Sequence, residues 1–308
     1  MKPAPRGKRA PSELRPALAF IAPNALGFLL FTAAPVAVSL GLSFTHWDML
    51  SPPRWAGVDN YAELIGFTAT PTGWKANDPF FWRYLGNTLF LLLGVPLNLA
   101  GSLALALLLN RPIRGRAFFR LVFYLPGILS GVAVFFLWKF LLHADYGLLN
   151  TTLRSLGLPA PGWLVDPAWA KPALLLMGFW IYAGGTGMVL YLAALQNVPE
   201  ELIEAARIDG AGRWAQFRHV VWPELRPVTF FLVTMGLING LQAGFDAAYV
   251  MTGGGPAGAT TTISYYLYRC AYQNFEMGYA SALAWVLFII VLAVTLLHWR
   301  HGREADTA

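Results

Sequence analysis

Six long stretches without Asp, Glu, Lys or Arg constrain this chain more than any other feature. The uncharged runs are Pro16–Trp47, Tyr84–Leu109, Leu121–Trp138, Pro172–Pro199, Val228–Phe245 and Met277–Trp299. A helix that crosses the hydrocarbon core needs roughly 20 mainly apolar residues, with a range of about 17–25, and all six runs reach that length. Because lipid offers no hydrogen-bond partners, a spanning segment must satisfy its own backbone groups, which favours helices over strands. The sequence therefore predicts an all-α membrane protein with six transmembrane helices.

The first run is too long to be the apolar core of a secretory signal, although basic residues precede it. Such a core has about 7–15 residues. We expect the run to be an uncleaved first span behind a basic, Pro-rich cytoplasmic tail at residues 1–16. The transmembrane domain is then predicted over residues 17–299, and a second cytoplasmic tail over residues 300–308.

The distribution of Lys and Arg predicts the orientation of the chain. With the N-terminus inside, 15 of the 22 basic residues fall in cytoplasmic segments and 7 in outer loops. This excess fits the positive-inside rule and predicts that both termini are cytoplasmic. The net charge of +6 is then a topology signal. Nucleic-acid binding is disfavoured, because the basic residues are split among several short loops.

A polar segment at residues 196–227 separates the fourth and fifth apolar runs. Pro199 suits the first turn of a helix, and Asp209-Gly210 is a turn signal that ends one. A second short amphipathic helix is predicted to follow, ended by Pro223 and Pro227. A pair of helices lying on the membrane surface is the alternative. The segment carries five acids against four arginines, which favours docking to a basic pocket on a protein, because membrane-surface helices are rich in Lys and Arg.

The run EAARIDGAGRWAQFRHVVWPELRP at 204–227 closely resembles the EAA loop of ATP-binding cassette (ABC) importer permeases. Other segments are similar to the carbohydrate-uptake branch of that family, the maltose and glycerol-3-phosphate type. They include GVDNYAEL, NTLFLLLGVPLNLAGSLALALLLNRPIRGRAFFR and MTGGGPAGATTTISYYLYRCAYQNFEMGYASALAWVLF. The last segment resembles the first of the two permease subunits in such systems.

The resemblance implies that the 196–227 loop is a helix-turn-helix coupling element, inserted into a groove of a cytoplasmic ATPase subunit. Glu204 would contact a basic residue of the ATPase, Ala205 and Ala206 would keep the helix slim, and Gly210 would make the bend. The matching motif positions further include Asp209, Ala211, Phe217 and Pro223. Trp222 and Glu224 depart from the apolar residues that usually flank the proline.

The sequence offers no source of energy of its own. It contains no GxxxxGK[ST] phosphate loop, and Asp246 is the single acid within a predicted span. We therefore expect a transport subunit without catalytic residues, with ATP and Mg²⁺ bound by a partner ATPase. One cysteine, Cys270, excludes an intrachain disulfide, and neither a metal site nor a cofactor on this chain is expected.

Polar and aromatic residues in the fourth and fifth runs are candidates for the substrate path. Asn239, Gln242 and Asp246 share one stripe of a continuous helix, and polar groups within spans are costly and often functional. Phe179, Tyr182 and Thr186 share a face of the fourth run, where rings can stack on sugar C–H surfaces. Helix packing is the alternative for all six, and it is the expected role of Asn87 and Asn98.

The resemblance implies an importer of a mono- or oligosaccharide in the cytoplasmic membrane of a bacterium or archaeon. Its partners would be a second six-span permease, an ATPase dimer and an extracytoplasmic solute-binding protein that docks near the glycine-rich loop at 252–262. A glycerol-3-phosphate or polyol importer of the same family is the alternative. A self-sufficient carrier or channel is disfavoured, because neither a second intramembrane charge nor an inverted repeat is present.

Overall fold

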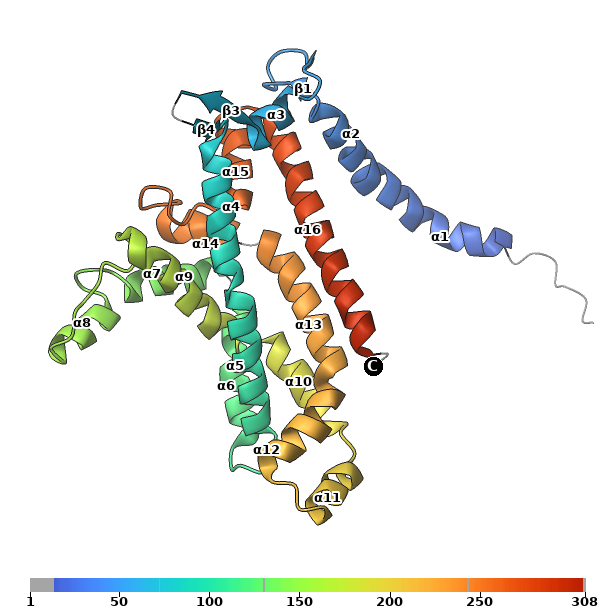
Figure 1. Cartoon of the computed structure of the whole chain (residues 1–308), viewed down its shortest axis with the longest axis vertical. Coiled ribbons are helices and arrows are strands. Elements are labelled where there is room, and N and C mark those ends of the chain that lie inside the picture. Colours follow the sequence, from blue (N-terminus) through green and yellow to red (C-terminus); the bar gives the residue numbers. More distant parts are fainter. Residues whose placement is uncertain (1–13, 72, 130, 243, 307–308) are drawn as a thin grey trace, which may run out of the picture.

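The computed structural model describes residues 14–71, 73–129, 131–242 and 244–306. Most of the predicted basic tail, residues 1–13, lies outside the described residues, as do the last two residues, 307–308. The structure is mainly helical (Figure 1). Its α-helices are α1 Leu14–Phe28, α2 Ala34–Leu42, α3 Asp59–Ile65, α4 Pro79–Leu92, α5 Gly94–Leu109, α6 Arg116–Ile128, α7 Gly131–Leu141, α8 Leu148–Ser155, α9 Pro167–Tyr182, α10 Thr186–Gln196, α11 Glu200–Ile208, α12 Arg213–Gln216, α13 Trp222–Gln242, α14 Phe245–Ala247, α15 Ile263–Tyr268 and α16 Met277–Asp306.

Four π-helical turns and two small antiparallel sheets complete the fold. The π-turns are η1 Leu29–Ala33, η2 Phe217–Val221, η3 Ala248–Thr252 and η4 Arg269–Gln273. Strand β1 (Thr45–His46) pairs with β2 (Arg54–Trp55), and β3 (Phe67–Thr70) pairs with β4 (Gly73–Ala76). Strand β1 takes up the end of the first predicted run, Pro16–Trp47, and β2–β4 lie between that run and the second.

Four helical stretches are long and apolar enough to cross a membrane: Ala19–Leu42, Pro79–Leu109, Arg213–Gln242 and Met277–Arg300. Two further pairs, α6 with α7 and α9 with α10, pass the same test but bend at short breaks. The described residues thus contain four candidate spans, or six if each bent pair crosses once.

The third predicted span, 121–138, is not one continuous helix in the structure but the bent pair α6 and α7. Helix α6 begins at Arg116, and Leu129, which follows its last residue Ile128, has an extended backbone with ψ of 151°. The sequence around this break contains Pro126, Gly127 and Gly131. Proline and glycine weaken a helix, which allows the chain to change direction here.

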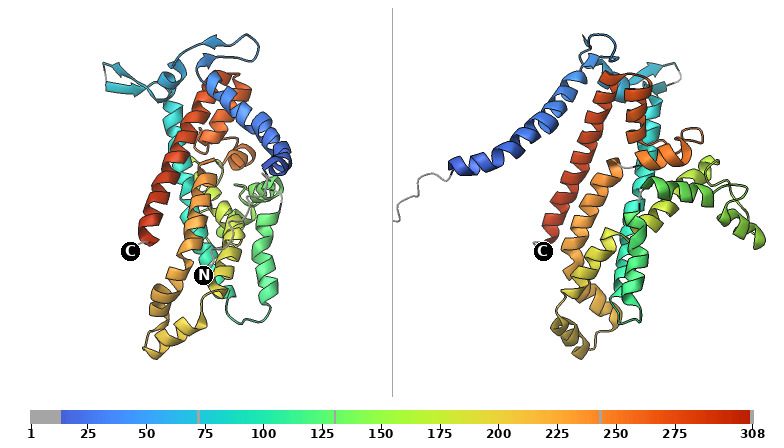
Figure 2. Two further views of the ribbon diagram at one scale, coloured as in Figure 1. Left: turned by 90° about the vertical axis from the view of Figure 1, so that its right-hand side faces the viewer. Right: turned by 180° about the vertical axis from the view of Figure 1, so that it is seen from behind.

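Helices α4 and α5 form the longest column of the molecule, with α13 and α16 beside it (Figures 1 and 2). Strands β1–β4 and α3 lie at one end, which we call the hairpin end. The opposite end is formed by α11 and α12 and is called the α11 end. Helix α1 diverges from the bundle (Figures 1 and 2), and none of the Ala19–Leu42 helix is buried.

Buried side chains form separate clusters along the column. Near the hairpin end, Phe81 and Tyr84 of α4 pack with Ile263 of α15 and Leu283 of α16. Toward the α11 end, a second cluster joins α5, α10 and α13 and contains the fully buried Met188. A third cluster joins α7, α9 and η3. The buried interior is thus divided among clusters that each join three or more elements.

Candidate substrate cavity and coupling loop

A cavity of about 300 Å³ lies inside the bundle, between α4–α5, α7, α9 and the chain around the end of α13. This volume is at the lower end of the range for small-molecule sites, about 300–1,000 Å³. Apolar residues and glycines form most of its wall. The polar residues in the wall come from four parts of the chain and are Thr88, Asn98, Tyr182, Gln242, Asp246 and Thr262.

Three of the predicted path residues meet at this cavity. Tyr182 is the last residue of α9, Gln242 is the last residue of α13, and Asp246 lies in the short helix α14. All three have exposed side chains although they lie among the apolar helices. A phenol, an amide and a carboxylate on one wall offer both hydrogen-bond donors and acceptors. The wall can therefore donate hydrogen bonds to hydroxyl groups and accept hydrogen bonds from them.

The other three predicted path residues are not among the described residues that line the cavity. The ring of Phe179 packs on α5, where a Cβ added at Gly101 would lie 2.6 Å from it. Thr186 begins α10, beyond the break that follows α9, and Asn239 is exposed one turn before Gln242. Their predicted role in the path has no support from the cavity.

The predicted common face of Phe179, Tyr182 and Thr186 is interrupted by a helix break. Helices α9 and α10 meet at an angle of 45°. Gly184 lies against the Phe123 backbone, so that any side chain there would collide with it. The hydroxyl of Ser102 donates a hydrogen bond of 2.8 Å to the carbonyl oxygen of Ala183, which satisfies an acceptor freed by the break.

The predicted continuous stripe of Asn239, Gln242 and Asp246 is also wrong, because α13 ends at Gln242. Gly244 follows with a φ of +91°, a left-handed conformation that favours glycine. A Cβ at Gly244 would lie 2.7 Å from Cγ2 of Thr262. The close approach of these two segments, rather than helical spacing, brings Asp246 to the cavity.

Asn98 was expected to serve helix packing, but it lies in the cavity wall. Its Oδ1 atom is buried and has no hydrogen-bond partner in the described chain. Asn87 does serve packing: its Nδ2 donates hydrogen bonds of 2.9 Å to the carbonyl oxygens of Gly258 and Thr261. Both asparagines lie in one apolar run of the sequence. Their roles differ because different residues surround them in the folded structure.

The segment at the α11 end forms a helix, a tight turn and a second helix. The N–H of Ala211 donates to the carbonyl oxygen of Ala206 at 2.9 Å, and Gly210 has a φ of +79°. This is the hydrogen-bond pattern that closes a helix on a left-handed glycine. The side chain of Gln216 donates to the carbonyl oxygen of Ala211 at 2.6 Å and holds the turn against α12.

The predicted coupling residues divide into an exposed set and a supporting set. Glu204, Ala205, Asp209 and Gly210 are exposed, whereas Ala206, Ala211, Phe217 and Pro223 are half-buried. Exposed apolar side chains flank the acids: Ile208 is 86% exposed and Trp214 is 71% exposed. An exposed surface that combines large apolar groups and acids on a rigid turn is suited to a protein partner.

The prediction that Pro223 and Pro227 end the second helix is wrong. The chain is helical from Arg213 to Gln242, with the π-turn η2 directly before Trp222. The N–H of Trp222 donates to the carbonyl oxygen of Phe217, five residues earlier. This wider turn accommodates a following proline, which has no N–H to donate. The second helix of the loop is therefore continuous with the fifth apolar run.

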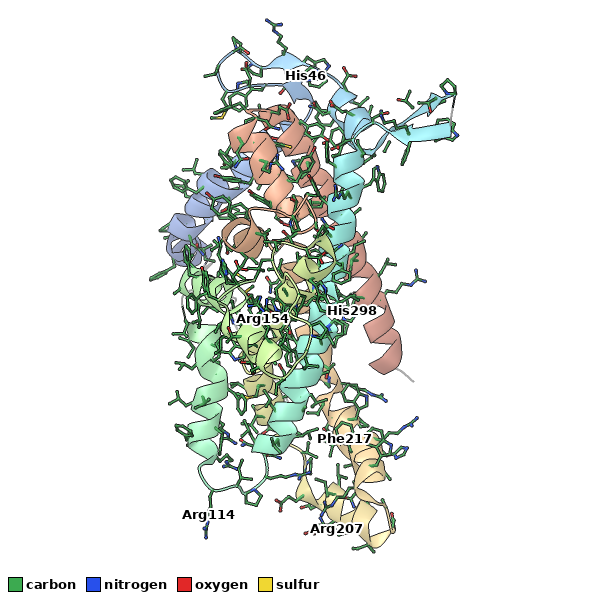
Figure 3. The ribbon with its side chains drawn as sticks, turned by 90° about the vertical axis from the view of Figure 1, so that its left-hand side faces the viewer. His46, Arg114, Arg154, Arg207, Phe217 and His298 are labelled. Carbon is green, nitrogen blue, oxygen red and sulfur yellow. The ribbon has the colours of Figure 1, made fainter. Side chains whose placement is uncertain are left out.

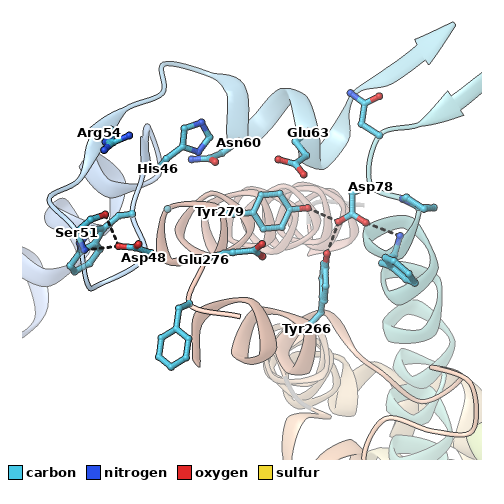
Figure 4. A pocket seen from close by; sticks show the side chains of 16 residues that line it. His46, Asp48, Ser51, Arg54, Asn60, Glu63, Asp78, Tyr266, Glu276 and Tyr279 are labelled. Atoms are coloured by element: carbon cyan, nitrogen blue, oxygen red, sulfur yellow. Dashed lines mark hydrogen bonds between the residues drawn. The ribbon is translucent and has the colours of Figure 1, made fainter. Parts of the chain in front are cut away.

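The hairpin end carries a pocket of about 780 Å³ (Figure 4). Its buried carboxylate, Asp78, accepts hydrogen bonds from the hydroxyls of Tyr266 and Tyr279 and from the N–H of Phe80. These bonds join α4 to α15 and α16, so that Asp78 has a structural role here. Among the described residues, no three His, Cys, Asp or Glu side chains are arranged to hold a metal ion.

Residues 90–300 match the family described as the inner membrane component of binding-protein-dependent transport systems. A probable ABC transporter permease of Bacillus subtilis, YesP, is 38% identical over 94% of this chain and 92% of its own length. The lactose transport permease LacF of Rhizobium radiobacter is 35% identical over 92% of this chain and 93% of its own.

A solved structure has the same fold over nearly the whole chain. It is a bacterial alginate ABC transporter in complex with an alginate pentasaccharide-bound periplasmic protein, with a TM-score of 0.80 and 25% identity. The alignment covers 96% of this chain and 98% of the other. The resemblance on which the sequence analysis relied is confirmed: this chain is an ABC transporter permease and belongs to the family of inner membrane components of binding-protein-dependent transport systems.

Proposed function

We propose that the chain is the six-span subunit of an ATP-driven importer that carries a neutral mono- or oligosaccharide into the cytoplasm. The observation that carries the proposal is the cavity within the bundle, whose mainly apolar wall contains Tyr182, Gln242 and Asp246. In this topology each bent helix pair crosses the membrane once. The membrane is the cytoplasmic membrane of a bacterium or archaeon.

The orientation follows from the basic residues at the α11 end. Arg114, in the turn between α5 and α6, and Arg207 of α11 both lie there, whereas His46 lies at the opposite end (Figure 3). Under the positive-inside rule, the α11 end faces the cytoplasm and the hairpin end faces outward.

The α11 turn is the proposed contact with the ATPase dimer, which holds ATP and Mg²⁺. Exposed Glu204 would pair with a basic residue of the ATPase, and exposed Ile208 and Trp214 would occupy apolar parts of its groove. Because Arg213–Gln242 is one continuous helix, movement of this turn acts directly on Gln242 in the cavity wall. Opening and closing of the ATPase dimer would in this way alternate the access of the cavity.

The charge of the cavity wall favours a neutral sugar over glycerol-3-phosphate. Asp246 is the one ionisable acid among its described lining residues, and no lysine or arginine is among them. An anionic substrate would meet repulsion there without a compensating cation. The lactose permease LacF is a relative that transports a neutral sugar by its name. A second permease subunit would complete the site, and a solute-binding protein would deliver the sugar.

Reconstituted uptake tests the proposal. The chain, its partner permease, the ATPase and the binding protein are placed in liposomes, and uptake of labelled neutral disaccharides is compared with uptake of glycerol-3-phosphate. We expect ATP-dependent uptake of a neutral sugar, abolished by Glu204→Arg. Glu200→Arg, in the first turn of the same helix, is the matched control and should retain most activity. Uptake without ATP, or unchanged uptake with Glu204→Arg, would contradict the coupling assignment.

A further inference from the structure

A smaller pocket at the hairpin end contains two arginines and no acid among its described lining residues. It has a volume of about 350 Å³ and lies between α4, η4 and the glycine-rich loop 252–262. Arg83 of α4 and Arg269 of η4 both line it. Neither guanidinium makes a hydrogen bond or ion pair with another described residue. We call this site the Arg83–Arg269 pocket.

The backbone on the third side of the pocket also offers donors. Ala257 and Gly258 have φ angles of +48° and +74°, and their N–H groups have no acceptor in the described chain. Successive free N–H groups in a turn are a common element of anion sites. The hydroxyl of Tyr84 is close by, because a Cβ at Gly258 would lie 3.3 Å from it.

Four carbonyl oxygens of the same loop accept hydrogen bonds from side chains of the chain itself. Thr261 donates through its hydroxyl to the carbonyl oxygen of Gly254 at 3.0 Å, and Thr260 donates to that of Gly255 at 2.8 Å. The carbonyl oxygens of Gly258 and Thr261 accept from Asn87. The loop is therefore held by its own threonines and by Asn87 of α4, while donors and positive charge remain in excess at the pocket.

We propose that the Arg83–Arg269 pocket binds a carboxylate side chain of the extracytoplasmic solute-binding protein when that protein docks. The planar guanidinium group binds carboxylates in a two-bond geometry, which makes arginine suited to such a contact. This inference rests on the proposed function, since it needs the hairpin end to face outward and a binding protein to be a partner.

The position of the pocket favours a protein carboxylate over an acidic substrate. The pocket shares no described lining residue with the mid-bundle cavity, and that cavity carries the opposite charge through Asp246. The two sites nevertheless lie on one short loop, because Thr261 lines the pocket and Thr262 lines the cavity. Adjacent residues of this loop thus line the pocket and the cavity.

The affinity of the binding protein for the complete importer in lipid nanodiscs tests this inference. The Kd is measured at low and at high salt for the unmodified importer, for an Arg83→Gln/Arg269→Gln variant, and for Lys75→Gln. Lys75 is an exposed basic residue of the β3–β4 hairpin at the same end, and it serves as the control for general charge. We expect the double variant to weaken binding about tenfold or more at low salt and to lose most of its salt dependence.

Each alternative outcome has a distinct meaning. Equal loss of binding-protein affinity in Lys75→Gln would indicate a general electrostatic attraction and would overturn the proposal that the Arg83–Arg269 pocket binds a carboxylate. Unchanged affinity in the double variant, with intact uptake, would overturn the pocket and leave the proposed function in place. Failure of the unmodified importer to bind any binding protein would overturn both. Since the arginine side chains make no hydrogen bond or ion pair within the described chain, the double variant should keep a Tm close to that of the unmodified importer, and Arg83→Lys/Arg269→Lys should bind with intermediate affinity.

Discussion

The side-chain amide of Asn87 donates a hydrogen bond of 2.9 Å to the carbonyl oxygen of Gly258, 171 positions later in the chain. Asn87 lies in α4 and Gly258 in the glycine-rich loop, so this bond joins the column of the bundle to the segment that separates the two candidate binding sites. Both ends of the amide are bonded, because its Oδ1 accepts a hydrogen bond of 3.2 Å from Nζ of Lys171 on α9.

Replacement of this amide should destabilise the hairpin half of the bundle. Asn87→Ala leaves the carbonyl oxygens of Gly258 and Thr261 and the ammonium group of Lys171 without their partner. Each unsatisfied buried group costs about 1–3 kcal/mol. We expect a lower Tm for the purified importer. Asn274→Ala, at an exposed asparagine, is the control and should leave the Tm unchanged. Equal Tm values for both variants would show that the Asn87 bonds contribute little.

Gln242 and Asn239 provide a matched pair for testing the candidate substrate cavity. Both are exposed amides one turn apart on α13, but only Gln242 is among the described cavity residues. Gln242→Leu removes a hydrogen-bonding group worth about 0.5–1.5 kcal/mol, so the KM for uptake should rise roughly 2- to 10-fold. Asn239→Leu should leave it unchanged. A similar increase for both variants would restore Asn239 to the path and place the substrate on a longer stripe.

Gly210 and Gly212 provide a matched pair for testing the proposed coupling turn. A Cβ would meet no atom within 4 Å at either position, but only Gly210 has a left-handed backbone. Gly210→Ala should therefore cost about 1–2 kcal/mol through backbone strain alone and loosen the end of α11. We expect less sugar uptake per ATP hydrolysed, with Gly212→Ala as the unaffected control. Full coupling in Gly210→Ala would mean that the ATPase reshapes the turn on docking.

Asp48 should make the hairpin end sensitive to acid. The N–H and hydroxyl of Ser51 donate to its carboxylate, and these bonds hold its pKa below the ordinary value of 3.8. Because the folded pKa is the lower one, this stabilisation is present above pH 3.8 and is lost as the pH falls through the folded pKa. Amide exchange at Leu50 and Ser51, corrected for intrinsic rates, should accelerate in that range, and Asp48→Asn should remove the transition. A transition retained in Asp48→Asn would assign it to another group.

The lengths of several spans could be predicted because they depend on local composition. The uncharged run Met277–Trp299 begins at the first residue of helix α16, Met277–Asp306, although the helix continues beyond the run. The observed helix Pro79–Leu109 ends where the predicted run does. Desolvation of the backbone acts on every residue of such a run, so composition alone is sufficient to identify it.

The breaks within spans could not be predicted in the same way. At Gly184 and Gly244, which lie at or next to helix ends, a neighbouring segment approaches too closely for a side chain. The apolar pattern continues through both positions and gives no sign of the neighbour. The predicted stripes through Thr186 and Asp246 assumed straight helices and failed there.

The sequence by itself determined the apolar runs and the helix and turn at Glu200–Gly210, because these depend on residues that are near in the chain. Its motifs also identified the ABC permease family. The tertiary structure decided which polar side chains meet. It placed Asn98 in the cavity wall, hydrogen-bonded Asn87 to the glycine-rich loop and placed Arg83 and Arg269 in one pocket. Such partners are separated by long stretches of chain, and helix breaks rotate the faces on which they lie. Packing between helices therefore decides the sites, whereas composition decides the spans.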